Sequence, residues 1–153
     1  MSSSTKKLLP RLKVFNFLEE ADYPVIQRYM FSYDYEKGAY FFKEGAHGGY
    51  MFFIVDGEVE IIKQLDTEKH TITTLSQGRS VGKMSLIDGR PRSATARAKS
   101  ALKLIASKRE DFNKLNEEQP VIANKVLMDI ASLLSYSLCE TNKRFTEKLL
   151  SIC

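Results

Sequence analysis

Hydrophobic and polar positions divide this chain into three parts. Apolar residues recur at helix-like intervals over 10–18, and again from about Asp22, a suitable N-cap with Pro24 in the first turn. From about Ser32 the pattern changes to alternation, and glycines separate short runs of β-branched and aromatic residues. The helical period returns after residue 107. We therefore expect one domain with an N-terminal helical segment (1–31), a β-rich part (32–107) and C-terminal helices (108–153).

The β-rich part contains one strong local turn signal. Two apolar runs, 50–55 and 58–62, flank Asp56-Gly57, and this dipeptide suits the positive φ angles of a type I′ turn. The pattern predicts a β-hairpin here, and a second hairpin with its turn over 66–69. Further strands are expected over 94–98 and 102–106. Short strands at regular spacing predict a mainly β fold with flanking helices (α+β), an antiparallel β-roll or jelly roll.

A long C-terminal helix is expected to follow these strands. Ser107 can cap a short helix, and Pro120 then suits the first turn of a helix of roughly 30 residues, about 45 Å long. This length exceeds what a small roll covers. One heptad-like stripe contains Ala131, Leu134, Leu138, Thr141, Phe145 and Ile152. The helix either folds back on its own sheet or forms a two-fold dimer seam, and we favour the homodimer.

Composition indicates a soluble, cytoplasmic domain. The 153 residues suffice for one core, and 43% hydrophobic and 27% charged residues are ordinary for a globular protein. The polar N-terminus does not resemble a signal peptide, and we expect no segment long and apolar enough for a membrane. The net charge of +4 is spread along the chain, so charge alone does not favour DNA binding.

The residues needed for catalysis are sparse. His47 and His70 are the two histidines, too few for a metal-dependent double-stranded β-helix enzyme. Cys139 and Cys153 have no metal-ligand spacing, and no pattern pairs Cys139 with a histidine for nucleophilic catalysis. We therefore expect no enzyme, no metal and no cofactor.

Residues 78–96 carry the clearest candidate chemistry. A glycine-punctuated strand end leads into one helical turn, and an arginine follows just before the next strand. Gly82 would let a ligand approach the backbone closely, and Arg92 could donate a bidentate contact to a phosphate. The alternative is an ordinary loop with a solvated arginine. From these residues alone the two interpretations are equally supported.

This segment resembles the phosphate-binding cassette of cyclic-nucleotide-binding domains, as found in catabolite activator protein, the protein kinase A regulatory subunit and nucleotide-gated channels. That pattern is Gly-Glu, a short helix, then Pro-Arg-Ser/Ala-Ala-Thr, and residues 82–95, hereafter the cassette, are similar to it. The turn 43–45, the segment 53–59 and the regions 109–112, 120 and 131–142 also look like parts of this family.

The resemblance implies a role for each cassette position. Gly82 and backbone amides near Met84 and Ser85 would bind the exocyclic oxygens of a cyclic phosphate, Arg92 would neutralise it, and Ser93 would assist. Apolar residues such as Val81, Leu86 and Ile72 would flank sugar and base. The C-terminal helix would close over the base through Ser135, Ser137 or Thr141.

Lys83 departs from the family pattern. The family's glutamate accepts a hydrogen bond from the ribose 2′-hydroxyl, whereas lysine has three donors and no acceptor. Lys83 could hold the phosphate, turn to solvent while the site binds weakly, or mark a site adapted to another anion.

The resemblance therefore implies a sensor domain for cAMP or cGMP that signals through its C-terminal helix. The alternative is a degenerate module that binds another anion or only a protein partner. The chain ends soon after the long helix, which leaves no room in it for a helix-turn-helix DNA-binding domain. We expect a stand-alone sensor with a downstream protein partner, or part of a longer product.

Overall fold

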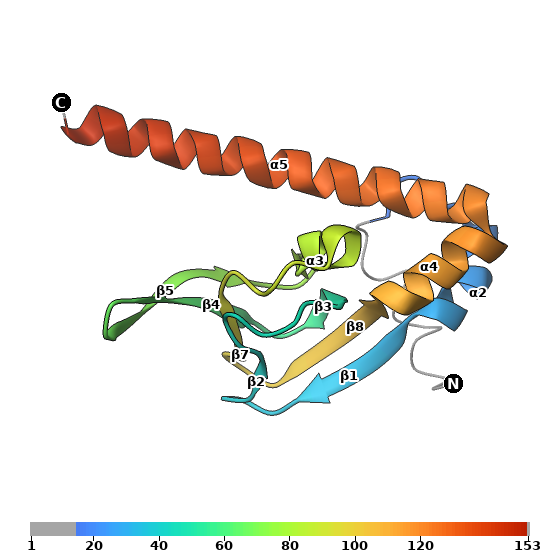
Figure 1. The fold of residues 1–153 in the computed structure, drawn as a ribbon, viewed down its shortest axis with the longest axis horizontal. Helices are drawn as coiled ribbons and strands as arrows, with labels where there is room; N and C mark the ends of the chain where they lie inside the picture. Colours follow the sequence, from blue (N-terminus) through green and yellow to red (C-terminus); the bar gives the residue numbers. More distant parts are fainter. Residues whose placement is uncertain (1–14, 153) are drawn as a thin grey trace.

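Eight antiparallel strands form two four-stranded sheets, and a long C-terminal helix runs along one side of them (Figure 1). The computed structural model describes residues 15–152. One sheet has the order β1-β8-β3-β6, with β1 (Phe31–Tyr35), β3 (Tyr50–Asp56), β6 (Ser80–Val81) and β8 (Leu102–Lys108). The other has the order β2-β7-β4-β5, with β2 (Tyr40–Phe42), β4 (Val59–Leu65), β5 (Glu68–Leu75) and β7 (Thr95–Ala98). The predicted antiparallel β-roll with flanking helices is confirmed.

The N-terminal segment packs on the roll in short helical turns. These are η2 (Glu20–Asp22), α2 (Tyr23–Ile26) and η3 (Gln27–Tyr29). The prediction of a helix over 10–18 is wrong for its described part, because residues 15–18 are bends and coil. Its first five residues lie outside the described residues. Asp22 precedes Pro24 as expected, but its carboxylate binds the Glu19 N–H and Lys125 rather than capping α2.

Asp56-Gly57 is not the turn of a hairpin, and that prediction is wrong. β3 pairs with β8 and β6, whereas β4 pairs with β5 and β7, so the dipeptide carries the chain from one sheet to the other. Gly57 has φ +93°, but Asp56 remains in the extended strand, so the type I′ geometry is absent. A Cβ on Gly57 would stand 2.3 Å from the Ala101 carbonyl oxygen, which makes glycine necessary at this corner.

The remaining local predictions are partly confirmed. The β4–β5 hairpin exists, but only Asp66 and Thr67 form its turn, with Asp66 at φ 56°. Helix α4 (Arg109–Glu118) follows β8 directly. Ser107 lies inside β8 and does not cap α4, because its N-cap position is Lys108.

Strand β3 separates two layers of the core. Its side chains alternate, as a strand requires. Met51, Phe53 and Val55 pack against the helices, while Phe52 and Ile54 face the interior of the roll. Leu86, on α3 (Lys83–Asp88), belongs to the helix-facing layer with Ile122, Ala123, Val126 and Ile130 of the long helix. The cassette helix is thereby attached to the C-terminal helix.

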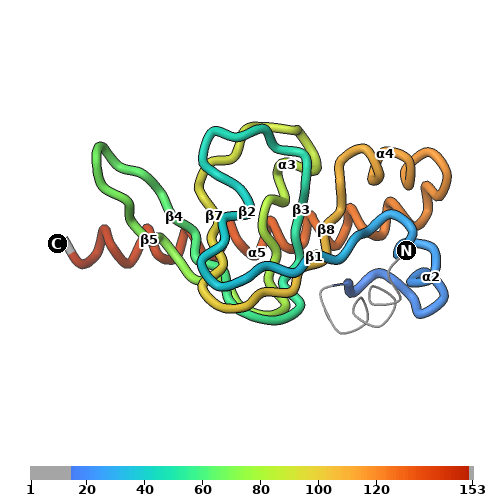
Figure 2. The backbone as a smooth tube through the Cα atoms, turned by 90° about the horizontal axis from the view of Figure 1, so that it is seen from below, coloured from blue at the N-terminus to red at the C-terminus, as the bar shows by residue number. Residues whose placement is uncertain are grey.

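The long helix is α5 (Pro120–Ile152), with 33 residues spanning about 50 Å. The short helices and α4 gather around its beginning, and the β4–β5 hairpin lies towards its far end (Figure 2). By length and composition alone α5 could cross a membrane, which corrects the expectation that no segment qualifies. A single helix of this kind is weak evidence for a membrane segment. Ala123, Val126 and Ile130 are packed in the core, although only 28% of the apolar stretch is buried.

Candidate ligand-binding site

A cavity of about 430 Å³ lies between the cassette, the roll and α5. Its volume falls in the range of small-molecule sites. All six site residues predicted from the sequence line it: Gly82, Lys83, Met84, Ser85, Arg92 and Ser93. Phe42, Ile61, Val81, Arg90, Pro91, Ala94, Leu134 and Ser137 complete the lining. The structure therefore brings the cassette residues together around one space, hereafter the cassette cavity.

Arg92 is the buried cation of this cavity. The residue is only 6% exposed, so the alternative interpretation of a solvated arginine is wrong. Its Nη1 donates to Ser85 Oγ (3.0 Å) and its Nη2 to the Tyr50 carbonyl oxygen (2.7 Å). The guanidinium carbon lies 4.2 Å from the centroid of the Phe42 ring. These contacts hold the guanidinium in place from three segments of the chain.

The charge of Arg92 is not neutralised by the protein. Among residues 15–152, no carboxylate forms an ion pair with Arg92, and its buried Nε has no hydrogen-bond partner. Burial lowers the pKa of Arg92 below its ordinary value, because desolvation disfavours the charged form. A buried cation with unused donors is a strong site for an anion.

Gly82 is required by the packing of Arg92. It has φ +81°, and a Cβ there would stand 2.2 Å from Arg92 Nη1 and 2.8 Å from the Tyr50 carbonyl oxygen. The sequence predicted that this glycine admits a ligand to the backbone. In the structure it admits the arginine side chain.

Lys83 lines the cavity but reaches back to Ser80, the first residue of β6. Its Nζ lies 3.3 Å from Ser80 Oγ and 3.5 Å from the Ser80 carbonyl oxygen. Burial lowers the pKa of Lys83, and the positive charge of Arg79 lowers it further. The side chain is half-buried, so the interpretation that it turns to solvent does not describe this structure.

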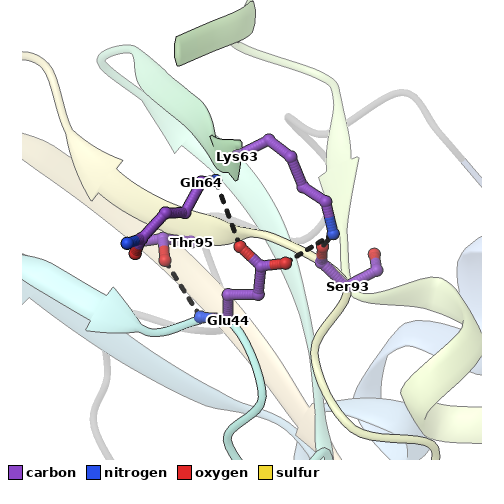
Figure 3. A network of polar contacts seen from close by, with 5 residues as sticks. All are labelled: Glu44, Lys63, Gln64, Ser93 and Thr95. Carbon is purple, nitrogen blue, oxygen red and sulfur yellow. Dashed lines mark hydrogen bonds and ion pairs between the residues drawn. The ribbon is translucent and has the colours of Figure 1, made fainter. Parts of the chain in front are cut away.

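A polar network fixes the end of the cassette, and no local sequence signal indicates it (Figure 3). Lys63 Nζ donates to Glu44 Oε1 and to the Ser93 carbonyl oxygen (2.7 Å). Glu44 also accepts the Gln64 N–H (3.2 Å), and its own N–H donates to Thr95 Oγ1 (2.9 Å). Ion pairing with Lys63 lowers the pKa of Glu44. Ser93 thus contributes its carbonyl oxygen to the network and remains exposed at the cavity.

Several expectations about the apolar and helical lining need correction. Val81 lines the cavity, but Leu86 is buried in the core and Ile72 is 57% exposed on β5, away from it. Phe42 and Ile61 provide the apolar wall instead.

From α5, Ser137 lines the cavity together with Leu134. Ser135 and Thr141 do not line it. The Ser85 N–H is already bonded to the Gly82 carbonyl oxygen (3.1 Å), within the first turn of α3.

Comparison with known proteins identifies the family. A sequence model described as "Cyclic nucleotide-binding domain" matches residues 33–119, which is more than half of the chain. The chain belongs to the cyclic nucleotide-binding domain family. The match includes the whole cassette and all eight strands except the first two residues of β1.

Relatives of this family differ in what surrounds the domain. A cyclic nucleotide-gated potassium channel of Rhizobium etli is 37% identical over 89 residues, which are 58% of this chain and 24% of the channel. The cyclic AMP receptor protein of Thermus thermophilus is 31% identical over 109 residues, 71% of this chain and 49% of that protein. The chain thus spans between a quarter and a half of the length of these relatives.

The fold agrees with a solved member of the family. A crystal structure of a cyclic nucleotide-binding domain from Methylobacillus flagellatus superposes with a TM-score of 0.87 at 28% identity. The superposition covers 95% of this chain and 85% of that domain. It supports the arrangement of the roll, the cassette and the flanking helices described above.

Proposed function

We propose that this protein is a cytoplasmic regulatory domain that binds cAMP or cGMP in the cassette cavity and signals through α5, without catalysing a reaction. The observation that carries the proposal is Arg92, a buried guanidinium that lines the cavity with no carboxylate partner in the described part of the chain. An anion on the ligand would supply the missing charge, and a cyclic phosphate carries one.

The rest of the cavity suits a nucleoside. Phe42, Ile61 and Val81 offer apolar surface for a sugar and a base, and Ser93 offers a hydroxyl. Leu134 and Ser137 bring α5 to the same space. A ligand in contact with both walls would bind more tightly to one helix position than to another, which is the condition for a signal.

The exposed half of α5 favours a homodimer as the signalling unit. Leu138 is 61% exposed and Phe145 is 64% exposed, both on the stripe predicted from the sequence. Apolar side chains that are left exposed on a projecting helix favour association, and a two-fold pair is the commonest form. A ligand-induced change in the position of α5 would then be transmitted to a downstream protein partner.

A second candidate function rests on Lys83. Lysine cannot accept a hydrogen bond from a ribose hydroxyl, and here it brings a second cation to the cavity. The domain would then bind a different anion, or would retain the fold for contact with a protein partner alone.

Calorimetric titration of the purified protein with cAMP, cGMP and a cyclic dinucleotide tests the proposal. We expect binding of cAMP or cGMP, weakened by roughly 10- to 100-fold in Arg92→Ala, because a charge-assisted hydrogen bond contributes about 1.5–3 kcal/mol. Arg28→Ala removes the same charge at an exposed position outside the cavity lining and should bind normally. Circular dichroism and thermal unfolding check that both variants fold, since Arg92 also supports the Tyr50 carbonyl. Equal affinity in Arg92→Ala would contradict the proposal.

A further inference from the structure

The cassette cavity carries an unusual balance of charge. Among the described residues, its lining contains three cationic side chains, Lys83, Arg90 and Arg92, and no aspartate or glutamate. Arg90 is exposed and paired, with its Nε 3.0 Å from Asp88 Oδ2. Within residues 15–152, the hydrogen bonds of Arg92 and Lys83 go to neutral groups, on Ser85, Ser80 and the Tyr50 carbonyl. Two cations that have no carboxylate partner in the described part of the chain, hereafter the unpaired cations, therefore line one cavity.

Both of these cations lose hydration through burial. Arg92 is buried and Lys83 is half-buried, and the pKa of each is lowered by desolvation. Arg79 adds a third positive charge near Lys83 and lies with its guanidinium 5.8 Å from the Tyr136 ring of α5. A ligand with one negative charge would compensate one of the two unpaired cations and leave the other uncompensated.

Lys83, which stands where the family pattern has glutamate, also removes the need for a hydroxyl group on the sugar. A carboxylate at position 83 would accept a hydrogen bond from a ribose 2′-hydroxyl, whereas the ammonium group of lysine can only donate hydrogen bonds. Contact between Lys83 and a ligand is therefore favourable only where the ligand presents an acceptor, and is strongest where that acceptor is charged.

We propose that the cassette cavity selects a nucleotide with at least two negative charges, one facing Arg92 and the other facing Lys83, over a singly charged cyclic mononucleotide. This inference rests on the proposed nucleotide-binding function and assigns its ligand class. The two charges could lie on one terminal phosphate or on two separate phosphates, and the experiment distinguishes these sources.

Three adenine nucleotides serve as probes in calorimetric titration. cAMP carries one negative charge, AMP carries two on one phosphate, and cyclic di-AMP carries two on separate phosphates. For the native protein we expect AMP or cyclic di-AMP to bind roughly tenfold or more tightly than cAMP. The preferred probe identifies the source of the second charge. The same titrations with the three corresponding guanine nucleotides test whether the preference depends on the base.

Variants at position 83 separate the charge effect from the fold. Lys83→Gln should abolish the preference for the doubly charged probe. Lys99→Gln should retain it, because Lys99 is exposed and follows the last residue of β7. Lys83→Glu should reverse the preference and restore discrimination against 2′-deoxy-cAMP. The preference in the native protein should also shrink as salt is raised.

The outcomes separate this inference from the proposed function. If cAMP binds as tightly as both doubly charged probes, or if Lys83→Gln leaves the preference unchanged, the inference is wrong while nucleotide binding stands. If no nucleotide in either series binds, both are wrong. Loss of the preference in Lys83→Gln with its retention in Lys99→Gln supports the inference.

Discussion

The guanidinium of Arg92 lies directly against Gly82, with its Nη1 only 2.2 Å from where a Cβ of residue 82 would stand. The glycine and the arginine are ten residues apart in the chain and depend on each other. A side chain at position 82 would displace the guanidinium, and it would also strain a backbone at φ +81°. This relationship gives a direct test of whether the position of Arg92 matters for binding.

Gly82→Ala should abolish or strongly reduce nucleotide binding. Gly45→Ala is the matched control, because Gly45 also has φ +81° but nothing lies within 4 Å of its added Cβ. Both variants should lose about 1–2 kcal/mol of the free energy of unfolding from the left-handed backbone. Only Gly82→Ala should also lose affinity. Urea unfolding and calorimetry measure the two quantities, and equal affinity in both variants would show that displacing Arg92 has no consequence.

Asp129 should make stability fall as the pH rises from acid to neutral. It is 1% exposed, and it accepts the Asn16 N–H (2.8 Å) and the Phe17 N–H (3.4 Å). Burial raises the pKa of Asp129 above 3.8, despite these two donors. Its contribution to stability is therefore fully present below about pH 3.8 and is lost as the pH rises through the folded-state pKa. Asp129→Asn should remove this loss, so urea unfolding should show the variant gaining stability relative to the native protein between about pH 4 and pH 7.

Asp22 should show the opposite dependence on pH. The hydrogen bond from Lys125 lowers the pKa of Asp22 below 3.8, and the Glu19 N–H lowers it further. Its contribution is present above about pH 3.8 and is lost as the pH falls through the folded-state pKa. Asp22→Asn should therefore destabilise the protein at neutral pH and have little effect in acid. The same pH dependence in both variants would contradict this assignment.

The far half of α5 should mediate self-association. Sedimentation should show a dimer at micromolar concentration, and Leu138→Glu should convert it to a monomer by placing a charge on the 61% exposed stripe position. Lys143→Glu changes the charge of the same helix elsewhere and should remain dimeric. Native protein that stays monomeric at high micromolar concentration would rule out the helix seam.

Ligand binding should protect the middle of α5 from hydrogen exchange. The buried residues of α5 lie between Ile122 and Ile130, whereas Leu134 and Ser137 reach the cassette cavity from a helix segment that is mostly exposed. Saturating nucleotide should slow amide exchange after Leu133, by stabilising one position of this segment. Identical exchange with and without ligand would indicate a passive binding module.

The sequence by itself determined several of the strands and the long C-terminal helix. Alternation and helical periodicity are local properties, so they identified the runs that became β3, β7, β8 and α5. The cassette could also be recognised from the sequence, because its glycine, arginine and serine lie close together in one continuous segment. The six predicted site residues all line the cavity for that reason.

Tertiary structure alone decided how these segments combine. Asp56-Gly57 has the composition of a hairpin turn, yet β3 pairs with β8, about fifty residues away, and separate core layers cover its two faces. The orientation of Arg92 depends on Phe42, Tyr50 and Ser85, which converge from three segments. Pairing partners and the burial of a charge are properties of distant residues brought together, and no local pattern encodes them.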